Sequence, residues 1–233
     1  IKEDKLRILR LFRFLAEFNK GRSDIDQDTM EALYKYKKEV KWLSRERIWM
    51  ELKRILSVPE PQHIFSIMIE EGILDDVLPP IEVKEFSKVI TAEKKYSVSP
   101  SHLVRLFSLN KSIGKKWAHY VSLTSNEAKI LEFIKESLAH YKDLKTVAYK
   151  FGRVVAEGWL LNYHDGSSEM IPSKISEIID NGCNAFFPVS GVDLLEEMEE
   201  GPELGRQMER LEDLWIKSGF KMSKEELLSK SKS

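Results

Sequence analysis

The sequence has almost no cysteine and no long apolar run. Of its 233 residues only Cys183 is a cysteine, so the chain cannot form an internal disulfide, which is typical of a reducing compartment such as the cytoplasm. No stretch of about 18 apolar residues is present, so we expect no membrane span. With 11 Gly, 8 Pro and 42% hydrophobic residues, the composition excludes collagen-like and disordered chains and predicts a folded protein.

Signatures of catalysis and of cofactor binding are also missing. The sequence contains neither GxGxxG nor GxxxxGK[ST], the glycine-rich patterns that bind phosphates. Its five histidines show no HExxH motif and no paired metal-ligand spacing. Cys183 has no neighbouring histidine in the sequence to activate it as a nucleophile. We therefore expect no catalytic residue and no metal ligand in this chain.

The charge is balanced overall but unevenly distributed. The formal net charge is -1 and the pI about 6.6, which excludes a globally basic nucleic-acid-binding protein. Residues 1–58 nevertheless carry 15 Lys and Arg against 10 Asp and Glu, whereas residues 169–233 carry 8 against 14. An anionic partner is therefore expected to bind the first part of the chain, because the acidic end would repel it.

Apolar residues recur mainly at helical spacing. Leu6, Leu9, Phe12 (or Arg13), Leu15 and Phe18 recur at steps of three and four residues, which predicts a helix with one buried face. Similar patterns recur to the end of the sequence, and the alternating runs are too short to build a sheet. We expect an all-α, elongated, multi-helix fold with no substantial sheet.

Local signals predict where several helices begin and end. Asn19-Lys20-Gly21 ends the first helix, with Gly21 as the left-handed cap. Asp28 or Thr29 is expected to cap the second helix and Ser44 the third. A long helix is expected over Leu144–Trp159.

We divide the chain into a neck (1–58), a helical body (59–139) and a helical tail (140–233). The sequence starts at Ile1 within a helical pattern and without a helix cap. We therefore expect it to be part of a longer protein that continues on the amino-terminal side.

Two motifs in the neck are more specific than this general pattern. The first, Glu3-Asp4-Lys5-Leu6-Arg7, continues into Ile8-Leu9-Arg10, and the second is Ser44-Arg45-Glu46-Arg47-Ile48 followed by Glu51-Leu52. In order and separation they resemble the EDxxR and ERIxxEL motifs of class II tRNA nucleotidyltransferases (CCA-adding enzymes) and the related bacterial poly(A) polymerases. The match is strong over about residues 1–57 and moderate over 186–228, where Gly191-Val192-Asp193-Leu194 resembles a motif of the family's tail. Lys5 stands where many members have proline.

The resemblance implies the neck, body and tail of such an enzyme, without its catalytic head. The whole enzyme would transfer CMP and AMP from CTP and ATP to the 3′ end of tRNA, with Mg²⁺ bound in the head. This chain alone is then expected to be inactive and to supply base selection and tRNA docking, in the cytoplasm. Two alternatives remain open: a bacterial poly(A) polymerase, which the acidic end disfavours, and a non-enzymatic helical protein-interaction domain. The sequence does not indicate an oligomeric state.

Asp4 and Arg7 are the residues expected to select the base. They lie three residues apart on the expected helix, so both side chains leave the same face. A carboxylate only accepts and a guanidinium only donates hydrogen bonds, so the pair matches a base with an amino group beside a ring-nitrogen acceptor. Cytosine and adenine have this edge, whereas guanine and uracil present the reverse order. Arg10 would bind the triphosphate or brace Glu3, and the alternative is a surface ion pair between Asp4 and Arg7 worth a few tenths of a kcal/mol.

The remaining candidates have supporting or RNA-binding roles. Glu46, Arg47 and Glu51 are expected to clamp their helix against the first helix, with an intrahelical pair between Arg47 and Glu51. Two basic groups, each with aromatic neighbours, are candidates for binding tRNA phosphates. They are Lys35, Lys37, Lys38 and Lys41 near Trp42, and Lys142, Lys145, Lys150 and Arg153 near Tyr149.

Overall fold

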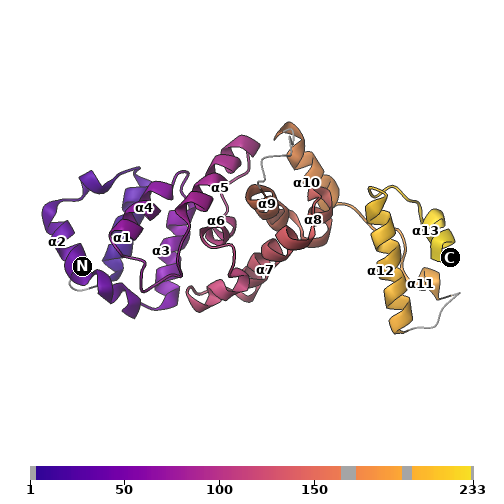
Figure 1. The fold of residues 1–233 in the computed structure, drawn as a ribbon, viewed down its shortest axis with the longest axis horizontal. Coiled ribbons are helices and arrows are strands. Elements are labelled where there is room, and N and C mark those ends of the chain that lie inside the picture. Colours follow the sequence, from indigo (N-terminus) through magenta and orange to yellow (C-terminus); the bar gives the residue numbers. More distant parts are fainter. Residues whose placement is uncertain (1–3, 164–171, 196–200, 232–233) are drawn as a thin grey trace.

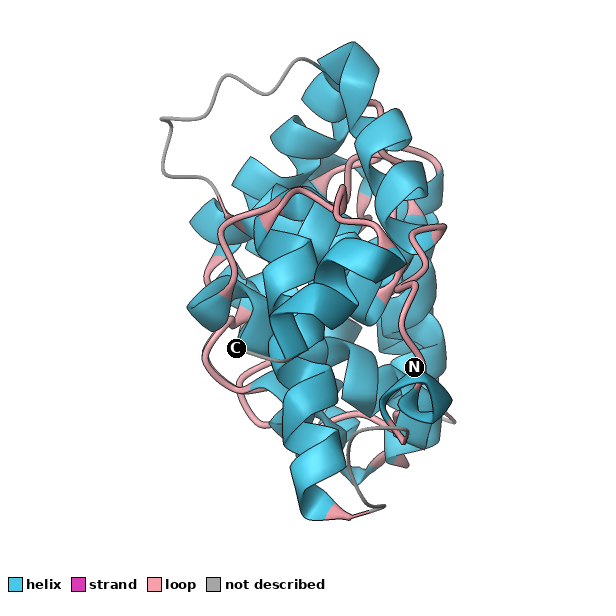
Figure 2. Cartoon of the chain, turned by 90° about the vertical axis from the view of Figure 1, so that its right-hand side faces the viewer, coloured by secondary structure: helices cyan, strands magenta, loops and turns pink. Residues whose placement is uncertain are grey.

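The fold is entirely helical over the part of the chain that is described. The computed structural model describes residues 4–163, 172–195 and 201–231, and every regular element in these ranges is an α-helix or a 3₁₀-helix, with no strand (Figures 1 and 2). The predicted all-α class is therefore confirmed. The elements are α1 (Leu6–Glu17), η1 (Arg22–Asp24), α2 (Gln27–Tyr36), η2 (Lys37–Trp42), α3 (Arg45–Ser57), α4 (Gln62–Glu70), α5 (Val83–Tyr96), α6 (His102–Leu109), η3 (Gly114–His119), α7 (Ser125–His140), α8 (Leu144–Phe151), α9 (Arg153–Asn162), η4 (Pro172–Lys174), α10 (Ile175–Cys183), α11 (Gly191–Leu194), α12 (Pro202–Lys217) and α13 (Lys224–Ser231).

The helices form a row from α2 at one end to α12 and α13 at the other, so the expected elongated shape is also confirmed (Figure 1). A continuous apolar core runs from Ile8 in α1 to Ile179 in α10. A second, smaller core joins the described residues from Val189 onward, which are called the tail from here on, and consists of Val189, Leu194, Leu211, Trp215 and Leu227. The first core continues across residues 58 and 139, so it does not separate the expected neck, body and tail from one another. The boundaries at these residues remain a prediction.

The tail is fastened to α8 by aromatic side chains. The ring of Tyr149 lies edge-on to Trp215 of α12 and to Phe220, with both centroid distances at 5.5 Å. The Tyr149 hydroxyl donates a hydrogen bond of 2.6 Å to Glu212, also on α12. One residue of α8 thus provides both apolar and polar contact with the tail.

Three local expectations need correction. The left-handed residue after α1 is Asn19 (φ 50°) rather than Gly21, and an asparagine tolerates this conformation because its side chain is short and polar. Asp26, not Asp28 or Thr29, caps α2 by accepting from the Thr29 amide at 2.9 Å. The helix expected over 144–159 is divided at Gly152, whose φ of 81° is outside the helical region. Ser44 does cap α3, as predicted.

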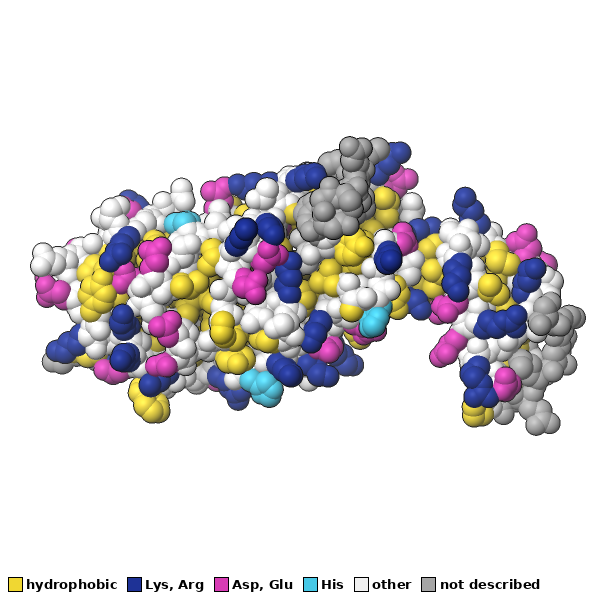
Figure 3. All heavy atoms as spheres, viewed as in Figure 1, with side chains coloured by type: hydrophobic (Ala, Val, Ile, Leu, Met, Phe, Trp, Pro, Cys, Tyr) yellow, Lys and Arg dark blue, Asp and Glu magenta, His cyan; other side chains and the backbone are white. Residues whose placement is uncertain are grey.

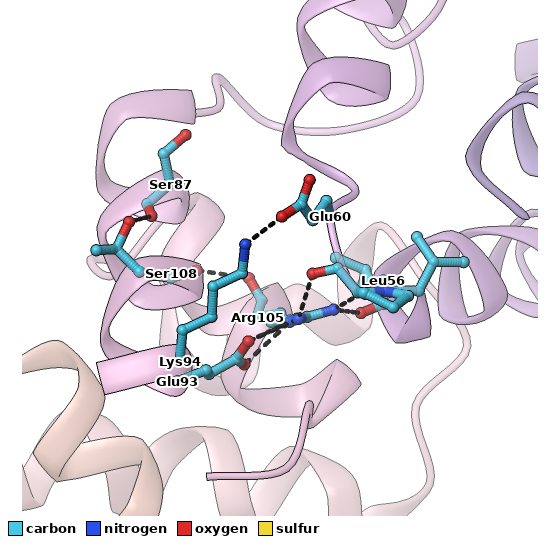
Figure 4. A network of polar contacts seen from close by, with 10 residues as sticks. Leu56, Glu60, Ser87, Glu93, Lys94, Arg105 and Ser108 are labelled. Atoms are coloured by element: carbon cyan, nitrogen blue, oxygen red, sulfur yellow. Dashed lines mark hydrogen bonds and ion pairs between the residues drawn. The ribbon is translucent and has the colours of Figure 1, made fainter. Parts of the chain in front are cut away.

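Arg105 ties three segments together: α6, α5 and the end of α3 (Figure 4). Its side chain on α6 is 1% exposed and forms an ion pair of 2.6 Å with Glu93 on α5, which is 4% exposed. The same guanidinium donates to the backbone carbonyls of Leu56, Val58 and Pro59, where α3 ends. Burial of this charge is tolerated because each nitrogen of the guanidinium donates a hydrogen bond, either to the Glu93 carboxylate or to a backbone carbonyl. The end of α3 is thereby fixed to α5 and α6, and this fixes the helix that supports the candidate site.

Candidate functional site

Asp4 lies immediately before α1, where two groups hold its carboxylate. Its Oδ1 accepts from the Leu6 amide at 3.0 Å, in the first turn of the helix. Its Oδ2 accepts from Arg47 Nη2 at 2.6 Å, across from α3. The pKa of Asp4 lies below its usual value. The hydrogen bond from the Leu6 amide is the largest cause, and the charge and hydrogen bond of Arg47 and the charge of Arg7 add to it. The carboxylate is therefore ionised and oriented before any ligand binds.

Arg7 and Arg10 face a pocket beside α1. The pocket has a volume of about 390 Å³ and is lined by both arginines, by Leu11 and Phe14 of α1, and by Thr29 of α2. Arg10 is exposed and has no ion-pair or hydrogen-bond partner among the described residues. Two cations and an aromatic ring at one pocket form a surface suited to an anionic ligand with a planar group.

Phe14 was not predicted as part of the site. It is 42% exposed, lies over the Arg13 guanidinium at 4.4 Å and packs against Phe18 at 6.4 Å between ring centroids. Its position seven residues after Arg7 places both on one helix face, and this spacing is the signal that would have indicated it. Thr29 carried no such signal, because α2 brings it to the pocket from a distant part of the sequence.

The second motif supports the site by reaching across to α1. Arg47 binds Asp4, and Glu51 forms a nearly buried ion pair of 2.8 Å with Arg13. The expected intrahelical pair between Arg47 and Glu51 is therefore wrong, since each residue has its partner on the α1 side instead. The expected clamp between α3 and α1 is present. It also positions Phe14, because Arg13 lies between Glu51 and that ring.

Glu46 binds on the other side of α3. Its Oε1 accepts from Ser122 Oγ at 3.2 Å, in the segment that follows η3. Hydrogen bonds from its own amide, then from Ser44 and Ser122, lower the pKa of this carboxyl group. Glu46 thus fixes the start of α3 to the body and does not reach the pocket. Glu3 lies outside the described residues.

The first basic group is only partly available for binding. Lys37 Nζ donates to the Glu71 carbonyl at 2.8 Å and Lys41 pairs with Asp76 at 3.2 Å, so both hold η2 against the turn at Gly72. Lys35 lies over the Tyr36 ring at 5.4 Å. Lys38 is exposed and has no partner among the residues that the structure describes.

The second basic group does not form one patch. The division at Gly152 puts Arg153 on α9, where it pairs with Asp180 and Glu157. Lys145 lies over the Phe220 ring at 4.2 Å, and Lys150 pairs with Glu212 at 3.7 Å. These cations hold α10 and the tail in place, and the exposed Lys142 is the member without a partner in the described chain.

The Arg47–Asp4 bond can be tested by titration. Replacing Arg47 with alanine is expected to raise the pKa of Asp4 toward its ordinary value of 3.8, though not fully, because the Leu6 amide remains. A carboxyl group with a lowered pKa contributes stability above its ordinary pKa and loses it as the pH falls through the folded value. Carboxyl NMR over pH 2–6 measures the change, with Lys53→Ala, elsewhere on α3, as the control. An unchanged Asp4 titration would contradict the proposed contact.

Two further features of the described residues concern metal ligation and membrane crossing. No three His, Cys, Asp or Glu side chains in ranges 4–163, 172–195 and 201–231 come together as ligands for a metal ion. In the same ranges, each helix is too short or too polar to cross a bilayer.

The chain is similar in sequence and in fold to one group of enzymes. Residues 24–85 match the family described as "Probable RNA and SrmB- binding site of polymerase A". The chain is related in sequence and fold to the body and tail portion of the CCA-adding enzymes and poly(A) polymerases.

Individual relatives show the same similarity. The chain is 29% identical over 98% of its length to "CCA tRNA nucleotidyltransferase 1, mitochondrial" from both Mus musculus and Homo sapiens. It spans 55% of each of these proteins, about half their length. A shorter match, 36% identical over 35% of the chain, is to the CCA-adding enzyme of Blochmanniella floridana and covers 20% of it.

Solved structures show the same fold at low sequence identity. The Thermotoga maritima CCA-adding enzyme complexed with tRNA superposes with a TM-score of 0.65 at 18% identity, over 98% of this chain and 60% of that one. A CCA-adding enzyme complexed with ATP gives a TM-score of 0.65 at 17% identity, over 97% of this chain and 59% of that one. The predicted family resemblance is therefore confirmed, and the likeness to these structures concerns the fold.

Proposed function

We propose that this chain is the base-selecting and tRNA-binding part of a CCA-adding tRNA nucleotidyltransferase. The whole protein would transfer CMP and AMP from CTP and ATP to the 3′ end of tRNA and release pyrophosphate. The observation that carries the proposal is the arrangement of Asp4, Arg7 and Arg10. An ionised carboxylate, fixed from two sides, interacts electrostatically with Arg7, which with Arg10 lines the pocket on α1.

This arrangement can read the edge of a base. Each carboxylate oxygen of Asp4 has two lone pairs and uses one of them within the protein, so one stays free to accept from an amino group. Arg7 would donate to the adjacent ring nitrogen, N3 of cytosine or N1 of adenine. Arg10 would bind the triphosphate, and Phe14 would pack against the base or ribose. Guanine and uracil would place a carbonyl oxygen against the carboxylate and be rejected.

Transfer of the nucleotide requires groups outside the described residues. Mg²⁺ would neutralise the triphosphate and activate the attacking hydroxyl. No carboxylate cluster in the described ranges suits it, so we assign no step of the transfer to this chain. In our proposal Mg²⁺ binds in a catalytic head, and the chain alone incorporates no nucleotide. The cytoplasmic location expected from the sequence also remains part of the proposal.

A poly(A) polymerase of the same family is the second candidate, supported by the name of the family matched at residues 24–85. The test joins this chain to the catalytic head of the Thermotoga maritima relative and supplies tRNA lacking its 3′ end with each of the four triphosphates. Addition that stops after the CCA sequence supports the proposal, whereas a long adenosine tract supports the polymerase. Failure of this protein to add any nucleotide, when the relative's own body and tail restore addition, would favour the helical interaction domain. The chain without a head is the negative control.

A further inference from the structure

Trp42 is unusually exposed for a tryptophan in a folded element. It ends η2 and is 80% exposed, whereas Val40 in the same element is fully buried. Tryptophan is highly buried on average, because its large ring gains the most from leaving water. The Lys41 ammonium lies 5.7 Å from the ring centroid, so the exposed face is also beside a cation.

The region around Trp42 joins two basic elements. Arg45, at the start of α3, donates to the Ala118 carbonyl in η3 at 3.1 Å, and Ser122 binds Glu46 in the same turn of α3. The end of η2, the start of α3 and η3 therefore lie side by side. In Figure 3, Lys and Arg side chains gather along the lower edge of the body, below α7.

Lysines on both sides of this junction are available for a ligand. Lys38 on η2 and Lys115 and Lys116 on η3 are exposed, and their ammonium groups have no partner among the described residues. Three acidic residues are nearby: Glu39 pairs with Lys5 at 3.3 Å, Asp76 pairs with Lys41, and the Glu132 carboxylate accepts a hydrogen bond of 3.1 Å from the Lys115 amide, which leaves the lysine ammonium groups in excess. The surface formed by Trp42, Lys38, Lys115 and Lys116, here called the Trp42 surface, is therefore locally cationic.

The Trp42 surface begins beside the candidate base-selection site. Lys5, adjacent to Asp4, pairs with Glu39 of η2 and lies over the Tyr36 ring at 4.1 Å. Arg47, which binds Asp4, is five residues after Trp42. A ligand bound on this surface would therefore lie next to a nucleotide held at Asp4 and Arg7.

We propose that the Trp42 surface binds the unpaired 3′ segment of the RNA substrate, with one base stacked on the Trp42 ring and the flanking phosphates beside the lysines. This inference rests on the proposed function, since it names the partner of the same region. An unpaired base offers a π-face to an aromatic ring, whereas bases within a double helix are already stacked on one another. The exposed tryptophan ring matches the base of such a nucleotide, and the lysines beside it match the phosphate.

The experiment compares two RNA hairpins that differ only at the 3′ end. One is blunt and the other carries three unpaired 3′ nucleotides, and the Kd of each for the 233-residue chain is measured by fluorescence anisotropy. Trp42→Leu is expected to weaken binding of the extended hairpin about five- to hundredfold and to leave the blunt hairpin unaffected. Trp42→Phe should retain most of the affinity. The double variant Lys115→Glu/Lys116→Glu should weaken both and flatten the dependence of log Kd on log salt concentration.

Matched controls lie far along the chain. Phe186 is 84% exposed, between α10 and α11, and Phe186→Leu should not change either affinity. Lys217→Glu/Lys221→Glu on the tail makes the same charge change as the η3 double variant and should have the smaller effect. Circular dichroism melting of each variant excludes loss of folding.

Each other outcome has a defined meaning. Unchanged binding of the extended hairpin by Trp42→Leu would overturn the proposal. Equal loss with Phe186→Leu would overturn it as well. If the wild-type chain binds both hairpins equally, the proposed role of the Trp42 surface is wrong, whereas the proposed base selection at Asp4 is unaffected. Binding of neither hairpin would also remove the RNA-binding part of the proposed function.

Discussion

Replacing Arg105 with methionine is expected to lower the free energy of unfolding by about 3–5 kcal/mol. The substitution leaves the Glu93 carboxylate buried without its cation and removes the donor to the carbonyls of Leu56 and Val58. A buried charge without a partner costs more than the ion pair itself contributes, because it keeps its desolvation penalty. For a chain of this length the melting temperature should fall by roughly 6–20 °C.

Urea denaturation followed by circular dichroism measures this effect, and Lys94→Met is the matched control. Lys94 also pairs with a glutamate, Glu60, but on the surface, so its loss should change stability by less than about 0.5 kcal/mol (Figure 4). The double variant Arg105→Met/Glu93→Gln should recover part of the loss, because the unpaired charge is then gone. Equal effects at Arg105 and Lys94 would show that the buried network does not hold α3 in place.

The second large effect is expected for Asp4→Ala in the protein joined to a catalytic head. The acceptor for the cytosine N4 or adenine N6 amino group is lost while Arg7 remains. A charged hydrogen bond contributes about 1.5–3 kcal/mol, so incorporation of C and A should fall roughly ten- to a hundredfold. Arg7 is then able to donate to O4 of uracil or O6 of guanine without an opposing carboxylate. Incorporation of U and G should therefore rise relative to incorporation of C and A.

Single-nucleotide addition with all four triphosphates measures this change in ratio. Arg7→Ala should reduce addition of C and A without a new preference for U. Arg47→Ala keeps the Asp4 carboxylate and removes its support, so it should relax selection less than Asp4→Ala does. Equal reduction of all four nucleotides by Asp4→Ala would make Asp4 a structural residue that holds the start of α1.

Helical spacing and the Ser44 cap were readable from the sequence because they depend on neighbouring residues, whereas the caps expected at Gly21 and at Asp28 or Thr29 were each misplaced by two or three residues. The apolar stripe of α1 and the Ser44 cap of α3 are local in this sense. The break at Gly152 was missed because the residues on both sides have good helical patterns, and the φ of one glycine decides the outcome.

Long-range partners were the part that the sequence did not specify. Arg13 and Glu51 are 38 residues apart, and each has a nearer residue of opposite charge on its own helix, Glu17 and Arg47. The sequence therefore favoured intrahelical pairs, whereas packing of α3 on α1 decides the actual partner of Glu51. Arg105 carried a recognisable signal, a single charge within the apolar segment His102–Leu109, but the segments that it joins became apparent only in the folded chain.

The aromatic attachment of the tail at Tyr149 has a consequence for how the molecule opens. The tail has a small core of its own, and its contact with α8 consists of the Tyr149 ring against Trp215 and Phe220, Lys145 over the Phe220 ring, and the bonds of Tyr149 and Lys150 to Glu212. Separate cooperative units of a protein open with their own free energies, and small units open most readily. Amide hydrogens of α12 and α13 should therefore exchange with solvent before those of α3 and α6. The Asp4 site and Trp42 lie on the slowly exchanging side, where the tail can detach and return without disturbing them.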